Sequence, residues 1–238
     1  MTPTPRRPDP QTVPLLLMTA VTGIVEAASL LGLGHVFTAV MTGNVLFLGF
    51  GLAGEDLSVV GSGTAVAAFA LGAFGGHRVN LRLVERRGPH WTPVAVAGVA
   101  ALLLAAALTA LGLPRQNGAP TARDLLVIAV LALAMGWRNA TTLRLAVPGL
   151  PTTVLTRGFT GLFRVHAALD SRERQVAAAV AMTAGAIAGA LLLHLRPAVP
   201  LLAAAAVELL SAELFRRGAA RPAASRGPDG DGDGDDRP

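Results

Sequence analysis

The sequence predicts an all-α integral membrane protein with about six transmembrane helices plus two re-entrant or broken segments, arranged as a 3+3 inverted repeat. Three observations support this prediction. Long apolar runs fill most of the 238 residues, arginines are concentrated in the gaps between the runs, and the two halves of the chain resemble each other. Together they indicate a class, a topology and a polar centre inside the bundle.

Composition separates this chain from soluble domains. Residues of the set AVILMFWYC make up 52%, charged residues 15%, and the mean hydropathy is +0.54. A soluble domain averages about 25% charged residues, so this chain lacks the polar groups that would cover a water-facing surface. Arginines in loops between membrane spans account for the formal net charge of +5, and we therefore expect a lipid bilayer and no nucleic acid as the partner.

Six apolar runs are predicted to cross the bilayer, whose hydrocarbon core is matched by about 20 helical residues. They cover about residues 14–33, 59–79, 92–113, 125–137, 176–195 and 198–215. The run 125–137 is short, and we expect residues 139–145 to complete its helix. Residues 1–13 and the acidic tail 218–238 are predicted to be disordered, which leaves residues 14–217 as a single membrane domain.

Two further segments, 37–52 and 152–168, are apolar but interrupted. The first contains Thr-Gly-Asn at residues 42–44, and the second carries Arg157 and Arg164. An arginine at mid-bilayer costs about 2.5–3.5 kcal/mol on insertion scales. We therefore expect both segments to enter the bilayer and return, with their irregular backbone surrounded by protein. Full crossing is the alternative.

The placement of arginine predicts the orientation. All 20 basic residues are arginines. If the amino terminus is cytoplasmic and both interrupted segments return, only Arg115, Arg123 and Arg196 face the outside. The other 17, including Arg138, are then cytoplasmic, as the positive-inside rule favours. The imbalance disappears if both segments cross. The sequence therefore predicts a multi-pass protein with both termini in the cytoplasm.

The two halves, about residues 14–113 and 121–217, match at a nearly constant offset. Residues 23–27 recur as residues 136–140, which is 113 positions later. Three crossings in each half is an odd number, so the second half must be inverted relative to the first.

Pairs of glycines four residues apart recur at the same offset. Such pairs allow close approach of membrane helices, so we expect them to pack the two repeats together, with homodimerisation as the alternative. The glycines are Gly72, Gly76, Gly185 and Gly189.

Glu26 is the first candidate site residue, because a lone carboxylate near the bilayer centre is costly. It would serve as a coupling group or solute ligand. Alternatively, it would be a hydrogen-bonded packing residue, equivalent to Asn139 in the second half. Glu208, in the last apolar run, is a further candidate for coupling.

Thr42, Asn44 and Thr156 lie in the expected turns of the two dipping segments, where they would line a solute site or stabilise broken helices. Helix amino termini that meet near the midplane would offer free N–H groups to an anion or polar solute.

These features favour a small secondary transporter or channel for a small polar or anionic solute. The alternative is a non-catalytic membrane scaffold or partner-binding subunit. We expect no enzyme, because the sequence has no nucleophile–base constellation. We also expect no cofactor and no metal site, since His35, His166 and His194 are scattered along the chain.

At these motifs the sequence resembles the YoaK-type family, bacterial membrane proteins classed as a domain of unknown function. The family's Gly-x-x-Asp-Ala-x-Ser corresponds to residues 23–29, its Met-Thr-Gly-Asn to 41–44, its Met-Gly-x-Gln-Asn-Ala to 135–140 and its Thr-Thr-x-x-Thr-Gly to 152–157. The resemblance implies a multi-span protein of the bacterial inner membrane. It supplies no substrate and no catalytic residue.

This sequence departs from the family pattern at three positions. Glu26 replaces the usual Asp, Arg138 replaces the usual Gln, and Arg157 interrupts the second Thr-Gly. The longer acid keeps its charge but changes its reach, and Arg157 argues against strict symmetry between the two dipping segments.

Overall fold

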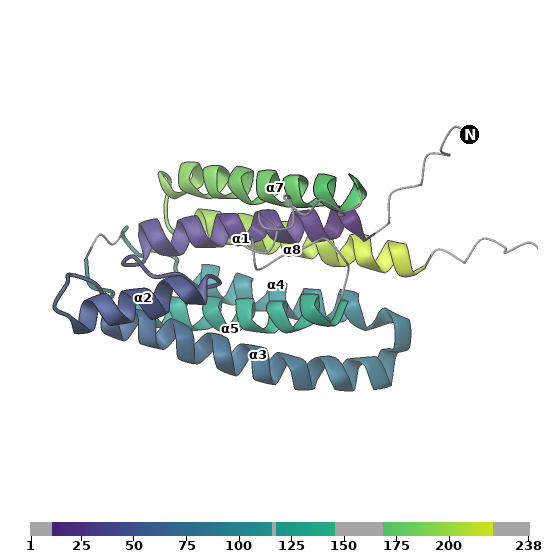
Figure 1. Cartoon of the computed structure of the whole chain (residues 1–238), viewed down its shortest axis with the longest axis horizontal. Coiled ribbons are helices and arrows are strands. Elements are labelled where there is room, and N and C mark those ends of the chain that lie inside the picture. Colours follow the sequence, from purple (N-terminus) through teal and green to yellow (C-terminus); the bar gives the residue numbers. More distant parts are fainter. Residues whose placement is uncertain (1–10, 116–117, 146–168, 221–238) are drawn as a thin grey trace, which may run out of the picture.

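The computed structural model describes residues 11–115, 118–145 and 169–220. Within these residues the chain forms long helices joined by short turns (Figure 1), which confirms the predicted all-α class. The helices are α1 (Thr12–Gly32), α2 (Met41–Leu52), α3 (Val59–Arg87), the 3₁₀ helix η1 (Gly88–His90), α4 (Trp91–Thr109), α5 (Ala122–Leu145), α7 (Leu169–Leu193) and α8 (Ala198–Ala219).

Five helical stretches of the described chain are long and apolar enough to cross a membrane. The longest of them contains α3 and α4, and the chain reverses direction between them at η1 (Figure 1). The apolar runs of the sequence therefore lie mainly in long helices. The five stretches are Thr12–Gly32, Val59–Thr109, Ala122–Leu145, Glu173–Leu193 and Ala198–Ala219.

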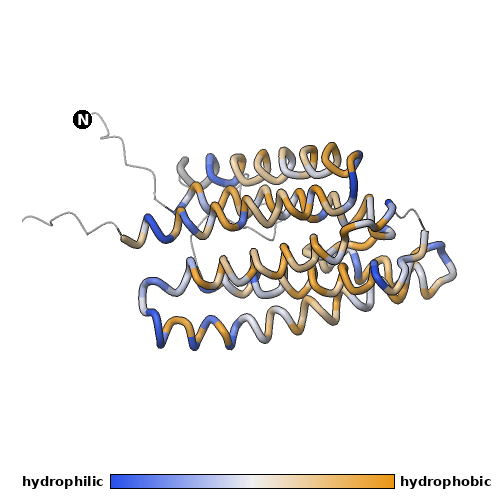
Figure 2. Tube along the Cα trace, turned by 180° about the vertical axis from the view of Figure 1, so that it is seen from behind, coloured by the Kyte–Doolittle hydropathy of each residue, from blue (hydrophilic) through white to orange (hydrophobic). Residues whose placement is uncertain are grey.

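The outward side chains of these helices are largely apolar. Leu71 and Phe74 of α3 and Val180 and Leu191 of α7 are all exposed. In Figure 2 hydrophobic residues fill the middle of the helices, and hydrophilic residues gather toward the two ends of the bundle. An apolar surface of this kind suits the hydrocarbon core of a bilayer and would be a liability in water.

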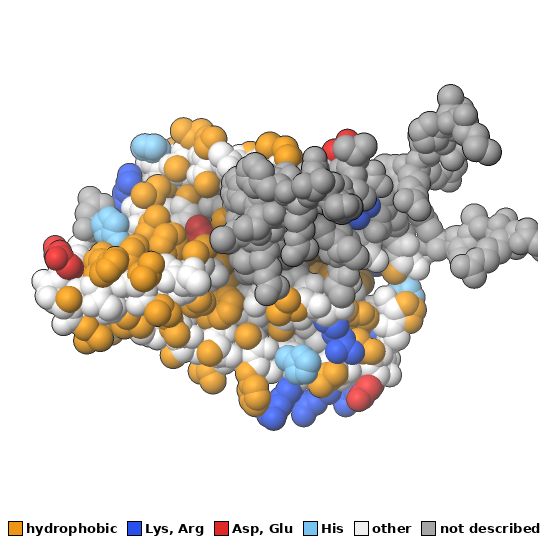
Figure 3. Space-filling view, viewed as in Figure 1, with side chains coloured by type: hydrophobic (Ala, Val, Ile, Leu, Met, Phe, Trp, Pro, Cys, Tyr) orange, Lys and Arg blue, Asp and Glu red, His pale blue; other side chains and the backbone are white. Residues whose placement is uncertain are grey.

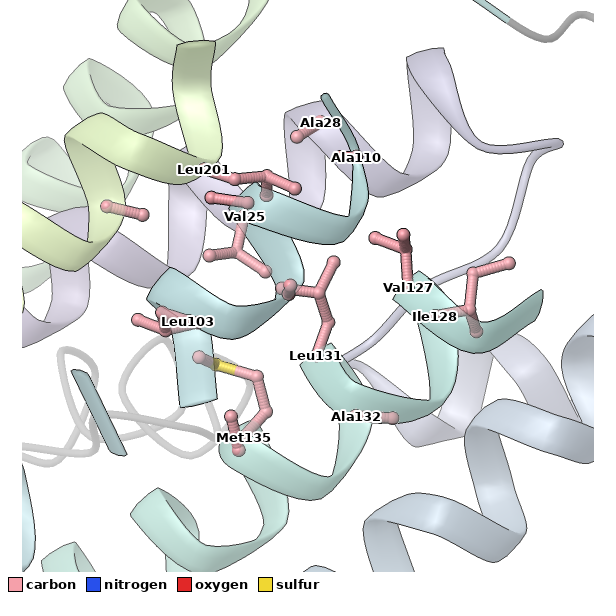
Figure 4. Close-up of a cluster of buried hydrophobic side chains, with 14 of the residues drawn as sticks. Val25, Ala28, Leu103, Ala110, Val127, Ile128, Leu131, Ala132, Met135 and Leu201 are labelled. Atoms are coloured by element: carbon pink, nitrogen blue, oxygen red, sulfur yellow. The ribbon is translucent and has the colours of Figure 1, made fainter. Parts of the chain in front are cut away.

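The core lies where α1, α4, α5 and α8 meet. Val25, Leu103, Leu131 and Leu201, one from each helix, are completely buried and converge on one cluster (Figure 4). α3 packs mainly on α5, and α7 packs mainly on α1. The bundle therefore has four central helices, with α3 and α7 on its flanks.

α2 is too short to run the length of the bundle. Its 12 residues give about 18 Å of helix, against a hydrocarbon core of about 30 Å. The chain turns after α1 at Gly34, whose φ of +93° suits glycine, and then runs back beside α1. α2 returns outward, and Gly51 near its end approaches Val59 at the start of α3. The segment thus enters and leaves at one end of the bundle (Figure 1).

α5 extends further than its apolar run. Thr121, just before the helix, and Asp124, in its first turn, form a capping box in which the Asp124 carboxylate accepts from the Thr121 N–H at 2.8 Å. The helix then continues to Leu145, past Arg138, which is buried. The prediction that Arg138 lies with the cytoplasmic arginines is therefore wrong. A helix needs about 20 residues to span the bilayer, and the apolar run alone is too short.

α3 and α5 approach closely at two glycines. A Cβ atom added at Gly72 would collide with the backbone carbonyl of Leu133, and one added at Gly76 would collide with Trp137. The absence of a side chain at each position lets the two helix backbones come together.

α7 and α1 pack in the same way. A Cβ atom at Gly185 would collide with the carbonyl of Ala20, and one at Gly189 would press on the backbone of Ile24. All four glycines therefore lie in contacts within one chain, and a homodimer would have to use another surface of these helices.

Candidate functional site

The Glu26 carboxylate binds the backbone of the segment that leads into α2. Glu26 is only 7% exposed. Its Oε2 accepts from the N–H of Thr38 at 3.3 Å, and its Oε1 accepts from the N–H groups of Ala39 and Val40, the latter at 3.0 Å. Val40 is the N-cap residue of α2. The carboxylate thus satisfies N–H groups at the start of this helix and opposes the positive end of its dipole.

This contact changes the expectation for the helix terminus. The N–H groups of residues 38–40 are not open to a solute, because Glu26 already accepts from all three. An anion could reach them only by displacing the carboxylate. The arrangement can therefore exchange one acceptor for another.

Asn44 holds the same segment from the other side. Its Oδ1 accepts from the N–H of Phe37 at 3.0 Å, and its Nδ2 donates to the Phe37 carbonyl at 2.6 Å. One buried amide therefore satisfies both backbone groups of a residue outside any helix, as backbone groups away from water require. The Phe37 ring also stacks on Phe47, with centroids 5.4 Å apart. Glu26 and Asn44 together fix residues 37–40.

Buried polar side chains continue along α1. Thr19, Thr22, Glu26 and Ser29 are all buried, and their spacing of three or four residues places them on one face of the helix. The two threonine hydroxyls donate to carbonyls one turn earlier, at 2.9 and 3.3 Å. Their donors are therefore satisfied within α1, and their oxygens can still accept from another helix.

Arg138 of α5 and Glu208 of α8 form a buried ion pair on this face. Arg138 Nε lies 3.3 Å from Glu208 Oε1, and the side chains are 5% and 0% exposed. Arg138 Nη1 also donates to Thr22 Oγ1 at 2.8 Å, which joins the pair to α1. Within the described residues, Arg138 Nη2 and Glu208 Oε2 have no hydrogen-bond partner. The pair therefore retains hydrogen-bonding capacity inside the bundle, which buried charged groups rarely do.

Comparison with known proteins identifies the family. A profile described as "Protein of unknown function (DUF1275)" matches residues 14–213, almost the whole membrane region. The chain belongs to the DUF1275 family. It is also 31% identical over 143 residues to the UPF0700 transmembrane protein YoaK of Bacillus subtilis (strain 168), and this match covers 60% of each chain. No solved structure matches. The resemblance to YoaK-type proteins is thereby confirmed.

In this DUF1275 protein, three of the predicted site residues take part in buried polar contacts. Glu26 and Asn44 bind the two ends of one irregular segment, and Glu208 belongs to the ion pair with Arg138. The two groups of contacts are linked through α1, because Thr22 lies one helical turn before Glu26 on the same face.

The other three predicted residues do not join this polar cluster in the described structure. Thr42 lies in the first turn of α2 and is exposed, so its side chain does not share the buried environment of Asn44. Asn139 is half-buried on α5, next to Arg138. Thr156 lies outside the described residues.

Arg138 and Thr22 are the functional candidates that the sequence did not identify. A signal for Arg138 was present in the DUF1275 sequence. The apolar run 125–137 is too short to span a bilayer, so its helix has to include the arginine that follows. Thr22 carried no such signal, because a threonine is common in membrane helices and only the position of Arg138 reveals its contact.

Proposed function

We propose that this protein is a small secondary transporter or channel for a small polar or anionic solute, in which Glu26 controls the position of α2. The observation that carries the proposal is the set of three hydrogen bonds from residues 38–40 to one buried carboxylate. A carboxylate within a membrane segment is costly and marks function by default. Irregular backbone at membrane depth is tolerated only against protein or a water-filled cavity.

The hydrogen bonds to Glu26 are exchangeable. A proton on the carboxylate removes its charge and weakens its hold on the N–H groups, because charge-assisted hydrogen bonds are about twice as strong as neutral ones. An anionic solute competes for the same donors. Either event frees the N–H groups of residues 38–40 and lets α2 move against α1. The Arg138–Glu208 pair then offers a polar surface further along α1.

The proposal includes a 3+3 inverted repeat with six crossings. It is supported by equivalent contacts at one offset. Gly72 contacts Leu133, and Gly185 contacts Ala20. Gly185 lies 113 residues after Gly72, and Leu133 lies 113 residues after Ala20. The α3–α5 contact thus corresponds to the α7–α1 contact. α1 and α5 also run in opposite directions (Figure 1). Inverted halves with a polar site between them are a common architecture of secondary transporters.

We further propose a bacterial inner-membrane location with both termini in the cytoplasm. The start of α1 and the end of α8 lie at the same end of the bundle as η1 (Figure 1). The last turns of α3 and α8 each carry two arginines, and basic side chains gather near the end of α3 on the face shown in Figure 3. Among the described residues, the arginines at the opposite end are Arg115, Arg123 and Arg196. The positive-inside rule favours this orientation.

Cysteine labelling tests the orientation, because the chain has no native cysteine. Asp56 and Arg86 are both exposed and lie at opposite ends of α3. In intact cells, Asp56→Cys should react with a membrane-impermeant maleimide, whereas Arg86→Cys should react only after permeabilisation. Arg217→Cys should behave like Arg86→Cys. The reverse pattern would contradict the orientation, and labelling of both Asp56→Cys and Arg86→Cys from one side would contradict a crossing by α3.

Replacing Glu26 tests the proposed activity. Glu26→Gln retains the size of the side chain and loses its charge, so it should abolish solute uptake or its pH dependence while the protein still folds. Uptake is measured in proteoliposomes against a panel of labelled small anions and polar solutes, with an entrapped pH-sensitive dye to report coupled protons. Glu55→Gln removes an exposed carboxylate and should leave flux unchanged.

Glu26→Asp separates charge from reach. It restores the residue that the family pattern usually has, so we expect partial flux with the pH dependence retained. Equal flux in wild type, Glu26→Gln and protein-free liposomes across the whole panel would contradict transport. It would favour the scaffold alternative.

A further inference from the structure

The end of the bundle opposite the two termini contains a hollow of about 400 Å³. Its walls come from the turn after α4 and from the turn between α7 and α8. They include Arg115 and Arg196, with Pro114 and Pro197 beside them. A volume of this size falls within the range of small-molecule sites, which is about 300–1,000 Å³.

The hollow is strongly cationic for its location. The described arginines at this end are Arg115, Arg123 and Arg196, and two of the three line the same hollow from distant parts of the sequence. α8 begins at Ala198, so the positive end of its dipole adds to the field. Of the described residues that line the hollow, none is acidic. Two arginines that line one hollow with no acidic lining residue beside them favour an anionic partner.

Arg115 is held in place for such a partner. Its Nε donates to the Leu31 carbonyl at 2.9 Å, which anchors the guanidinium beside the hollow, and the bond uses none of the Nη donors. Arg123 differs, because its Nη2 donates to the Leu111 carbonyl at 2.7 Å and it does not line the hollow. His194 lines the hollow as well and adds a ring nitrogen. The planar fork of arginine matches the oxygens of an oxoanion better than a spherical halide.

We propose that this hollow binds one phosphate-type oxoanion between Arg115 and Arg196. The same chemistry has two sources, a free phosphate in solution and the phosphodiester of a lipid headgroup. The proposal does not rest on transport, because a scaffold with this hollow would bind the same group.

The full chain in neutral detergent provides the test. Thermal unfolding is followed with increasing inorganic phosphate at constant ionic strength, with chloride as the compensating anion. In a second arm, binding of phosphatidylglycerol is followed by native mass spectrometry. The variants are Arg115→Gln and Arg196→Gln, and Arg123→Gln is the matched control from the same end of the bundle.

We expect phosphate or phosphatidylglycerol to bind and to stabilise wild type and Arg123→Gln alike, as a ligand specific for the folded state does. Each of the other two variants should require about tenfold more ligand, since each loses one charge-assisted contact. Arg115→Gln also loses the bond to Leu31, so Arg196→Gln decides the outcome if the former does not fold.

The two arms distinguish the sources. Stabilisation by phosphate assigns the site to a free solute, and binding of phosphatidylglycerol without a phosphate effect assigns it to a lipid headgroup. Equal responses from all three variants would overturn the proposal, because surface charge alone would then explain them. Failure of both ligands to bind wild type would overturn it as well.

Discussion

Replacing Arg138 by Gln should lower the free energy of unfolding by about 3–5 kcal/mol, the usual cost of leaving one member of a buried ion pair alone. Glu208 is fully buried, and it would lose the guanidinium that now lies 3.3 Å away. Glu208→Gln should cost a comparable amount. The double variant should cost much less than the sum of the two, because no uncompensated charge remains.

Thermal unfolding of the four proteins in detergent measures this coupling. Arg144→Gln is the matched control, because Arg144 is exposed on the same helix. Its loss removes a cation–π contact with the Trp91 ring at 5.9 Å and should change stability by no more than about 1 kcal/mol. An Arg138→Gln protein as stable as Arg144→Gln would contradict a buried pair. Additive losses in the double variant would show that the two charges do not depend on each other.

The long helices could be predicted from the sequence because they depend on local composition. An apolar run of about 20 residues has few alternatives to a membrane helix, and the runs at residues 14–33 and 198–215 lie within α1 and α8 apart from one terminal residue. Helix ends could not be predicted as well. α5 continues to Leu145 and buries Arg138 and Thr141 beyond its apolar run. Hydropathy does not distinguish a polar residue inside a bundle from one in a loop.

The site could be predicted only in part, for a related reason. Glu26 was recognisable from the cost of a carboxylate in lipid. Its partners were not, since backbone N–H groups of residues 38–40 carry no side-chain signature. Arg138 was misplaced because the positive-inside rule counts an arginine beyond an apolar run as a loop residue. Its partner Glu208 lies far away in the sequence, and only the packing of both α5 and α8 against α4 brings the two together.

Replacing a glycine by alanine should lower stability where the glycine packs two helices together and should not lower it elsewhere. Gly72→Ala should destabilise the protein by about 1–3 kcal/mol, the usual cost of overpacking. The added Cβ meets the carbonyl of Leu133, which belongs to a helix backbone and cannot rotate away, so α3 and α5 have to separate. Gly75→Ala is the matched control on the same helix, because its Cβ meets no atom within 4 Å. It should be neutral or stabilising by up to about 1 kcal/mol, since alanine favours the helix.

The proposed inverted repeat extends this prediction to the second half. Gly185→Ala places a Cβ against the carbonyl of Ala20, so it should cost about as much as Gly72→Ala when both are measured by thermal unfolding. The two losses should add, because the contacts are separate. Size-exclusion profiles should stay unchanged, since both glycines pack within one chain. A loss confined to one half would contradict equivalent packing, and a changed oligomeric state with unchanged unfolding would instead assign these glycines to a contact between copies.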